Sequence, residues 1–183
     1  MDIAPFAAAK RVDKVSTLSV APGRRRRKGS VIIELSFTLV PFLAMLFAIG
    51  DFAMPIFLHS TFDAAVREAV RFGVTYNTTY NGTSYSTQTD AIKAVVQGNS
   101  LGFLSGSTGL SQISVKYYLP VSPFGQVTGV GSNANGNILE VSIAGFNWLP
   151  MAPVNRLASA LSVGAISSDR LESLGVGAAR PAP

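Results

Sequence analysis

The feature that most constrains this chain is an apolar stretch directly behind a run of cations. Residues 24–28 are five consecutive cations, and residues 30–50 carry one charge, Glu34. As a helix, residues 30–50 would reach roughly 31 Å at about 1.5 Å each, which matches the hydrocarbon thickness of a bilayer. The stretch therefore predicts one membrane-spanning helix, with Asp51 at the point where the helix leaves the lipid.

The positive charge of the chain is concentrated in its leader, residues 1–29. The leader holds eight Lys and Arg against two Asp, a net charge of +6, whereas residues 30–183 have a net charge of −1. Cations that abut an apolar span are a topological signal, so we expect the leader in the cytoplasm and the C-terminal domain across the membrane. The alternative, phosphate binding by the same cations, is disfavoured because of this position, and we expect no nucleic-acid partner.

Two other export signals compete with a permanent membrane anchor. A secretory signal peptide has an apolar region of about 7–15 residues, and the stretch here is longer, although Ala48 and Gly50 could form a small-x-small cleavage site. Twin-arginine export is the other alternative, but nothing downstream suggests a cofactor-loaded passenger. The chain has no Cys, so it has no disulfide, thiolate metal site or lipid-modified cysteine. The sequence favours an anchor that is retained.

Beyond the membrane, the helix is predicted to continue to Gly73 with an amphipathic pattern. Phe62, Val66, Ala69 and Phe72 recur at three-to-four spacing and form one apolar stripe. Gly73 is expected to end the helix in a left-handed conformation. We predict that the small sheet does not cover this stripe fully and that Val66 and Ala69 serve lateral assembly with partner helices.

The rest of the chain, residues 74–174, predicts a small extracytoplasmic α+β domain. Residues 76–88 are polar and Tyr-rich and indicate a surface loop, and residues 91–97 indicate a short helix. Alternation of apolar and polar residues predicts three strands, at residues 113–119, 139–144 and 161–165. We expect one three-stranded antiparallel sheet with a face against the amphipathic helix, followed by a disordered tail, residues 175–183.

No residue pattern predicts catalysis. His59 is the one histidine and lies one helical turn before Asp63, so we expect a surface pair rather than a catalytic group. Gly129, Gly131 and Ala134 have the spacing of a dinucleotide-binding turn, but an Asn-rich segment follows where a helix would be required. We expect a protein that is not an enzyme and that has no cofactor or metal.

Glu34 requires an explanation, because an ionisable group just inside an apolar span is costly unless it is paired or reaches the interface. One explanation is that its side chain extends to the nearby headgroups. The other concerns Gly29 and Ser30: cleavage after Gly29 would give Ser30 a new ammonium group one helical turn from Glu34, within pairing distance of it or of a neighbouring subunit's carboxylate. We predict Gly29 and Ser30 as a processing site and Glu34 as an assembly residue.

The first part of the chain resembles the TadE-like family of minor pilins, or pseudopilins, of tight-adherence (Flp-type) pilus systems. The matching features are basic residues followed by Gly and Ser, a glutamate early in the span, a mid-span proline, a small-acidic exit, and a helix end with two arginines and a glycine. In this sequence they are Gly29, Ser30, Glu34, Pro41, Gly50, Asp51, Arg67, Arg71 and Gly73.

The resemblance implies a structural or assembly component of a bacterial pilus or related secretion apparatus in the inner membrane. Its partners would be other pilin or pseudopilin subunits, inner-membrane pilus assembly proteins, membrane lipid and a prepilin peptidase. The alternative is a secreted or membrane-anchored binding module, in which the Tyr-rich loop contacts a ligand. The two differ in their partners, because only a pseudopilin should associate with other pilins through its apolar helix.

Overall fold

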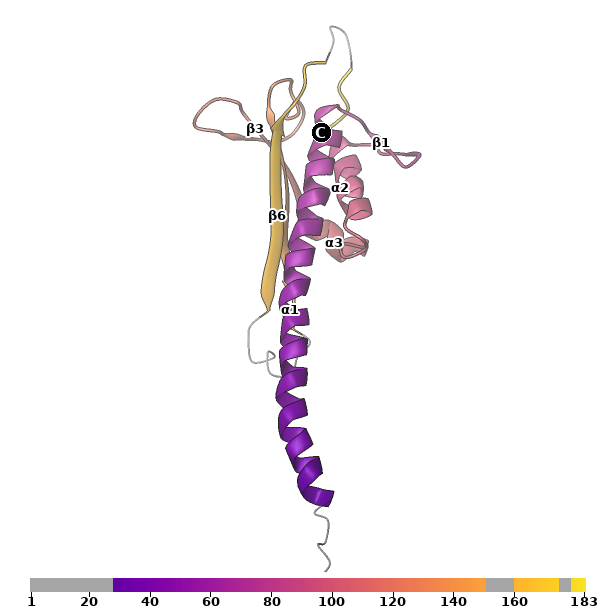
Figure 1. Ribbon diagram of the computed structural model, residues 1–183. Coiled ribbons are helices and arrows are strands. Elements are labelled where there is room, and N and C mark those ends of the chain that lie inside the picture. The colour runs from indigo at the N-terminus through magenta and orange to yellow at the C-terminus, as the bar shows by residue number, and fades with distance from the viewer. Residues whose placement is uncertain (1–27, 151–159, 175–178) are drawn as a thin grey trace, which may run out of the picture. The chain divides into compact units, whose positions relative to one another are not determined.

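The computed structural model describes residues 28–150, 160–174 and 179–183. The chain forms two compact units, residues 1–39 and 40–183, and each is considered by itself. The elements are α1 (Lys28–Val74), β1 (Thr79–Tyr80), β2 (Thr83–Ser84), α2 (Gln88–Asn99), α3 (Gly106–Gln112), β3 (Ile113–Tyr118), β4 (Gln126–Val127), β5 (Ile138–Trp148) and β6 (Leu161–Arg170) (Figure 1).

The predicted long N-terminal helix is α1, which is 47 residues long and includes both Pro41 and Pro55. From Leu58 onward one side of α1 is buried, and Figure 1 shows the sheet on one side of this half and α2 and α3 on the other. The core combines the buried stripe of α1 with apolar residues of α2 and the sheet. Its largest fully buried apolar members are Phe62, Leu58, Ile92, Leu104 and Leu139.

The α+β class with an antiparallel sheet is confirmed, but the single three-stranded sheet is wrong. The main sheet has four antiparallel strands in the order β4-β3-β5-β6, and β1 and β2 form a separate two-stranded sheet. The three predicted strands are β3, β5 and β6, which are the central pair and one edge. The two-residue strands β1, β2 and β4 are too short to show the alternation from which a strand is predicted.

The hairpin of β1 and β2 lies in the segment that was predicted to be a loop. Tyr80 pairs with Thr83, and the two residues between them, Asn81 and Gly82, have φ angles of 48° and 78°. An Asn-Gly pair with positive φ at both positions is the preferred two-residue turn of a hairpin. This dipeptide was therefore the sequence signal for the missed strands.

Strand β5 is longer than predicted, because it continues through an irregularity. The pairing of β5 with β6 shifts register between Ile143 and Phe146, and Gly145 in this gap has a φ of 79°. A glycine in this conformation is typical of a β-bulge. Phe146 and Trp148, which lie beyond the predicted strand at residues 139–144, are therefore strand residues that pair with β6.

The end of α1 also differs from the prediction. Gly73 is inside the helix and does not have a positive φ, whereas Tyr76, two residues past the helix, has a φ of 58°. A Cβ atom at Gly73 would lie 2.5 Å from Leu139 Cδ2 and 2.8 Å from Ile92 Cδ1. Glycine fits here because the Leu139 and Ile92 side chains, from β5 and α2, pack closely on the helix backbone, not because the helix turns left-handed.

A buried glutamine connects the end of α1 to the rest of the domain. Gln88, at the start of α2, is fully buried, and its Nε2 donates to the Gly73 carbonyl at 2.6 Å. Its Oε1 accepts from Asn133 Nδ2 at 2.7 Å. The same Asn133 amide donates to the Pro181 carbonyl at 3.0 Å, so the network also holds the C-terminal residues.

The C-terminal residues differ from the predicted disordered tail. Within the described part of residues 175–183, Ala182 forms a parallel bridge with Thr87, and its carbonyl accepts from the Gln88 N–H at 2.8 Å. Thr87 is also the N-cap of α2, since its hydroxyl accepts from the Asp90 N–H. These contacts place the end of the chain on the start of α2.

We expect Gln88→Met to lower the free energy of unfolding by about 1–3 kcal/mol, because it removes a buried amide and leaves the Asn133 amide short of an acceptor. Urea unfolding of the full chain in detergent, followed by circular dichroism, measures this change. Gln126→Met is the matched control, because Gln126 is exposed. Equal stability of the two variants would contradict a structural role for the network.

Candidate functional site: the apolar helix and the groove beside β6

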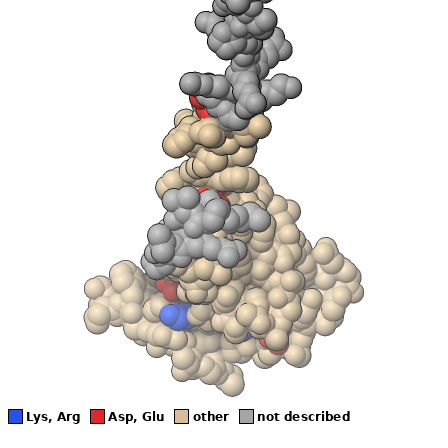
Figure 2. Space-filling model, turned by 90° about the horizontal axis from the view of Figure 1, so that it is seen from below, with Lys and Arg blue, Asp and Glu red and all other residues tan. Residues whose placement is uncertain are grey.

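Helix α1 exposes a continuous series of large apolar side chains before its buried half begins. Those that are exposed are Val31, Ile32, Ile33, Leu35, Phe37, Leu39, Val40, Phe42, Leu43, Met45, Leu46, Phe47, Ile49, Phe52, Ile56 and Phe57. Among the described residues, α1 is the one helix long and apolar enough to cross a membrane, and its most apolar window is not buried. Figure 2 shows few acidic or basic side chains on the described surface seen from below. This exposure is what a lipid-facing or subunit-facing helix requires.

Polar side chains in the first part of α1 are accommodated within the helix. The Ser36 hydroxyl donates to the Ile32 carbonyl at 2.9 Å, and the Thr38 hydroxyl donates to the Glu34 carbonyl at 3.2 Å. Hydroxyls bonded in this way present no unsatisfied donor to lipid. The Glu34 side chain is exposed on the same helix.

The predicted processing residues lie at the beginning of α1. The helix starts at Lys28, so the backbone of Gly29 and Ser30 is helical. A peptidase requires an extended bond, and the first turn of this helix would have to unwind before cleavage between Gly29 and Ser30. The processing role of these residues and the assembly role of Glu34 stay predictions.

Asp51 does not simply mark the exit of the helix from lipid. Its exposed fraction is 7%, whereas the next residue, Phe52, is 68% exposed. The acidic residue therefore faces the protein, and the apolar surface of α1 continues past it. The lipid-compatible surface is longer than the charge pattern indicated.

Val66 and Ala69 are both fully buried, and so is Phe62. The stripe is partly uncovered only at Phe72, which is partly buried, because α2, β3, β5 and β6 together enclose the other three residues. An assembly contact by Val66 or Ala69 would require the core to open. The sequence correctly predicted that these residues lie on one side of the helix. It could not predict whether that side is covered, because the cover comes from distant segments of the chain.

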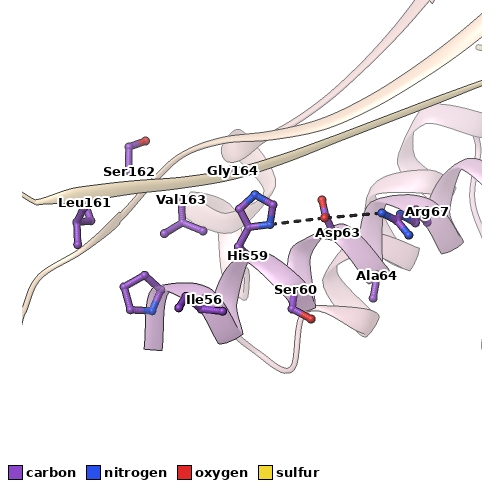
Figure 3. A pocket seen from close by; sticks show the side chains of 11 residues that line it. Ile56, His59, Ser60, Asp63, Ala64, Arg67, Leu161, Ser162, Val163 and Gly164 are labelled. Atoms are coloured by element: carbon purple, nitrogen blue, oxygen red, sulfur yellow. Dashed lines mark ion pairs between the residues drawn. The ribbon is translucent and has the colours of Figure 1, made fainter. Parts of the chain in front are cut away.

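A groove of about 890 Å³ lies between α1 and the edge strand β6. Its helix wall runs from Pro55 to Arg67, and its strand wall comprises residues 161–164. Figure 3 shows Ile56 and Leu161 at one end of the groove and Arg67 at the other. The groove is therefore apolar at one end and charged at the other.

The charged part of the groove is a short series of ion pairs on one face of α1. His59 Nδ1 lies 3.5 Å from Asp63 Oδ2, and Arg67 Nη2 lies 3.8 Å from the same oxygen (Figure 3). The pair of His59 with Asp63 was predicted from the one-turn spacing, and pairs of this exposure stabilise a helix by only about 0.3–0.5 kcal/mol each. Ser60, on the same turn of helix, points away from His59 (Figure 3). His59, Asp63 and Arg67 form the polar part of the helix wall of the groove.

Two tyrosines in the domain have shifted acid–base properties. Burial raises the pKa of Tyr117, whose hydroxyl lies 3.5 Å from Gln88 Oε1, and burial also raises the pKa of Tyr76. Both side chains are consequently neutral hydrogen-bonding groups in the folded domain. Among the described residues, no group of three or more His, Asp or Glu side chains is arranged to hold a metal ion.

The segment with dinucleotide-like spacing forms successive turns. The Ser132 N–H donates to the Gly129 carbonyl at 3.1 Å, and the Ala134 N–H donates to the Gly131 carbonyl at 3.1 Å. The segment leads into β5 and not into a helix. A phosphate-binding helix start is therefore not formed here.

Comparison with protein families matches part of α1. The TadE-like protein family matches residues 29–71, which confirms over that segment the resemblance seen in the sequence. The matched residues include the exposed apolar part of α1 and most of its buried part, and the sheet lies outside the match. Neither a curated protein nor a solved structure matches the chain.

We expect Ala69→Asp to destabilise the domain by about 3 kcal/mol or more, because it places an unpaired carboxylate in the core. Ala64→Asp is the matched control on the same helix, since Ala64 is exposed. Thermal unfolding in detergent, followed by near-ultraviolet circular dichroism, measures the difference. Similar melting of the two variants would show that the stripe is open to solvent.

Proposed function

We propose, from the premise that residues 29–71 are a TadE-like segment, that this protein is a minor pilin or pseudopilin of a tight-adherence pilus. The family match suggests a pilus-associated component in general, and the N-terminal apolar helix fits a membrane anchor in that context. The more specific role, a structural subunit that catalyses no reaction, is our proposal.

The observation that carries the proposal is the exposure of apolar side chains along residues 31–57 of α1 within the matched segment. Side chains of this kind must be covered by lipid or by protein. A subunit whose apolar helix is covered first by lipid and later by protein can reside in the membrane and then assemble with other pilin or pseudopilin subunits. The helix is the assembly surface in this proposal, in place of the buried Val66 and Ala69.

The proposed location is the bacterial inner membrane, with residues 1–29 in the cytoplasm and the α+β domain on the periplasmic or extracellular side. The net charge of +6 in the leader supports this orientation, because cations before a span are retained on the cytoplasmic side. Inner-membrane pilus assembly proteins and a prepilin peptidase are the further partners that we propose.

A photo-crosslinking amino acid at Phe47 tests the assembly role, because Phe47 is 57% exposed on the apolar helix. We expect its adducts in pilus-forming cells to contain other pilus subunits. The control is the same amino acid at Val130, which is fully exposed in the connection before β5. If Phe47 forms adducts with lipid alone while pili are made, the alternative of an anchored binding module is favoured.

The second test concerns maturation at Gly29. We expect Gly29→Ala to block the loss of the leader, because the cleaved bond requires a small and flexible residue. We expect Glu34→Gln to allow maturation but to weaken assembly, since an amine drawn into an apolar bundle without a carboxylate partner is penalised by several kcal/mol.

Mass spectrometry of the N-terminus of the membrane-extracted protein measures maturation. Gly50→Ala is the control for a glycine change in the same helix, because no atom lies within 4 Å of a Cβ placed there. An intact leader on the wild-type protein in cells that make pili would remove the processing role. Glu34 would then be explained by its contact with headgroups.

A further inference from the structure

Four apolar residues lie together at one end of the domain, and we call them the apolar rim: Ile56, Trp148, Leu149 and Leu161. Trp148 pairs with Leu161 across β5 and β6, and Ile56 lines the same groove as Leu161. Ile56, Leu149 and Leu161 are 71%, 70% and 46% exposed, and Trp148 is half-buried. A contiguous exposed group of this kind, which includes an aromatic ring, is typical of a contact surface.

Two of the three elements that carry the rim, α1 and β6, also carry charged residues at a distance from it. On β6, Leu161 is the first residue, and the exposed pair Asp169 and Arg170 ends the strand roughly 30 Å away. On α1, the charged wall of the groove from His59 to Arg67 follows Ile56 (Figure 3). Along α1 and β6 the residues that follow the rim therefore include charged side chains, although exposed apolar residues also occur elsewhere on the domain, such as Ile166 and Val130.

The rim lies at the level where α1 is expected to leave the bilayer. The exposed apolar run, residues 31–57, is roughly 40 Å long as a helix, about 10 Å more than the hydrocarbon core. The cations at residues 24–28 favour the cytoplasmic headgroups, so the surplus falls in the opposite headgroup layer, which is about 5–8 Å thick. Ile56, near the end of the run, lies in or beside that layer.

We propose that the apolar rim is immersed in the headgroup layer of the membrane that α1 crosses, so that the domain rests on phospholipid. The inference depends on the proposed membrane anchoring and extends it from the helix to the domain. Tryptophan suits this layer because it is amphipathic, with an apolar ring and one polar group. In Trp148 the indole N–H is itself buried, so the exposed part of the ring makes the proposed contact.

Lipid is favoured over a second protein as the occupant for two reasons. The rim is continuous with the apolar surface of α1, which is the membrane-contacting surface of the proposed function. It is also small: four residues compare with about 20–30 per partner in a stable protein interface. A bilayer surface requires no matched shape, so a few apolar side chains are sufficient for a contact that the anchored helix already holds in place.

Trp148 is the only tryptophan in the chain, so its fluorescence reports on the rim alone. The full chain is placed, one copy per nanodisc, in bilayers of phosphatidylethanolamine and phosphatidylglycerol. Some discs contain lipids brominated near the carbonyl end of the acyl chain, and others contain lipids brominated near the methyl end. We expect loss of Trp148 fluorescence with bromine near the carbonyl end, a smaller loss with bromine near the methyl end, and little quenching by aqueous iodide.

Leu161→Asn should reduce the quenching by brominated lipid and increase the quenching by iodide. The matched control is Leu119→Asn, because Leu119 has the same exposed fraction, 46%, and follows the end of β3 that pairs with the opposite end of β5. Circular dichroism shows whether either variant is folded. If Leu161→Asn is unfolded, the inference is tested by the wild-type protein alone, from the difference in Trp148 quenching between the two brominated lipids.

Quenching by iodide with none by brominated lipid would overturn the inference. Shielding from both quenchers in discs that hold one copy would also overturn it, because the ring would then be covered by the protein itself and not by lipid. Extraction by alkaline carbonate separates this inference from the proposed function. A chain that resists extraction but has an unquenched Trp148 contradicts only the rim, whereas an extractable chain contradicts the membrane anchor itself.

Discussion

The structure depends on one helix that has two different apolar surroundings along its length. In α1, large apolar side chains are exposed as far as Phe57, and from Leu58 one stripe is fully enclosed by the chain's own sheet and α2. Most of the first part is not covered by the described chain, apart from contacts near its end such as the buried Asp51 and the edge-on packing of Phe57 on Phe103, and the second part is the centre of the core. Both parts are segments of one continuous helix. When the domain folds around the second part, it therefore also determines the residue at which the uncovered apolar surface ends.

The rest of the domain packs closely on the backbone of α1 at Gly73. The absence of a side chain at Gly73 lets Leu139 and Ile92 reach the helix backbone, and the Gly73 carbonyl then accepts from Gln88. Gln88 in turn holds Asn133, which brings the connection before β5 against the start of α2. A few buried polar groups thus determine how the helices and sheet fit together, since each of them is satisfied in only one arrangement.

The sequence predicted the elements whose signal is local and missed those whose signal is not. The apolar span, the stripe on α1 and strands β3, β5 and β6 are visible because periodicity is a property of neighbouring residues. Helix α3 was missed because its sequence, Gly106–Gln112, has two glycines and no apolar stripe. The cover over Val66 and Ala69 could not be predicted, because it comes from α2 and strands far along the chain. For the same reason, the groove and the apolar rim follow from the fold and not from any motif.

The exposed part of α1 also limits how such a subunit could move between membrane and assembly. Sixteen large apolar side chains before Leu58 are 40–80% exposed, and covering each contributes a corresponding share of the about 1.5–3 kcal/mol for full burial. Their sum is tens of kcal/mol, which exceeds the typical 5–15 kcal/mol stability of a whole domain. A free intermediate in water is therefore excluded on energetic grounds. Transfer of this helix out of lipid requires that partner subunits cover its side chains as the lipid leaves, so extraction and assembly would have to be one coupled step.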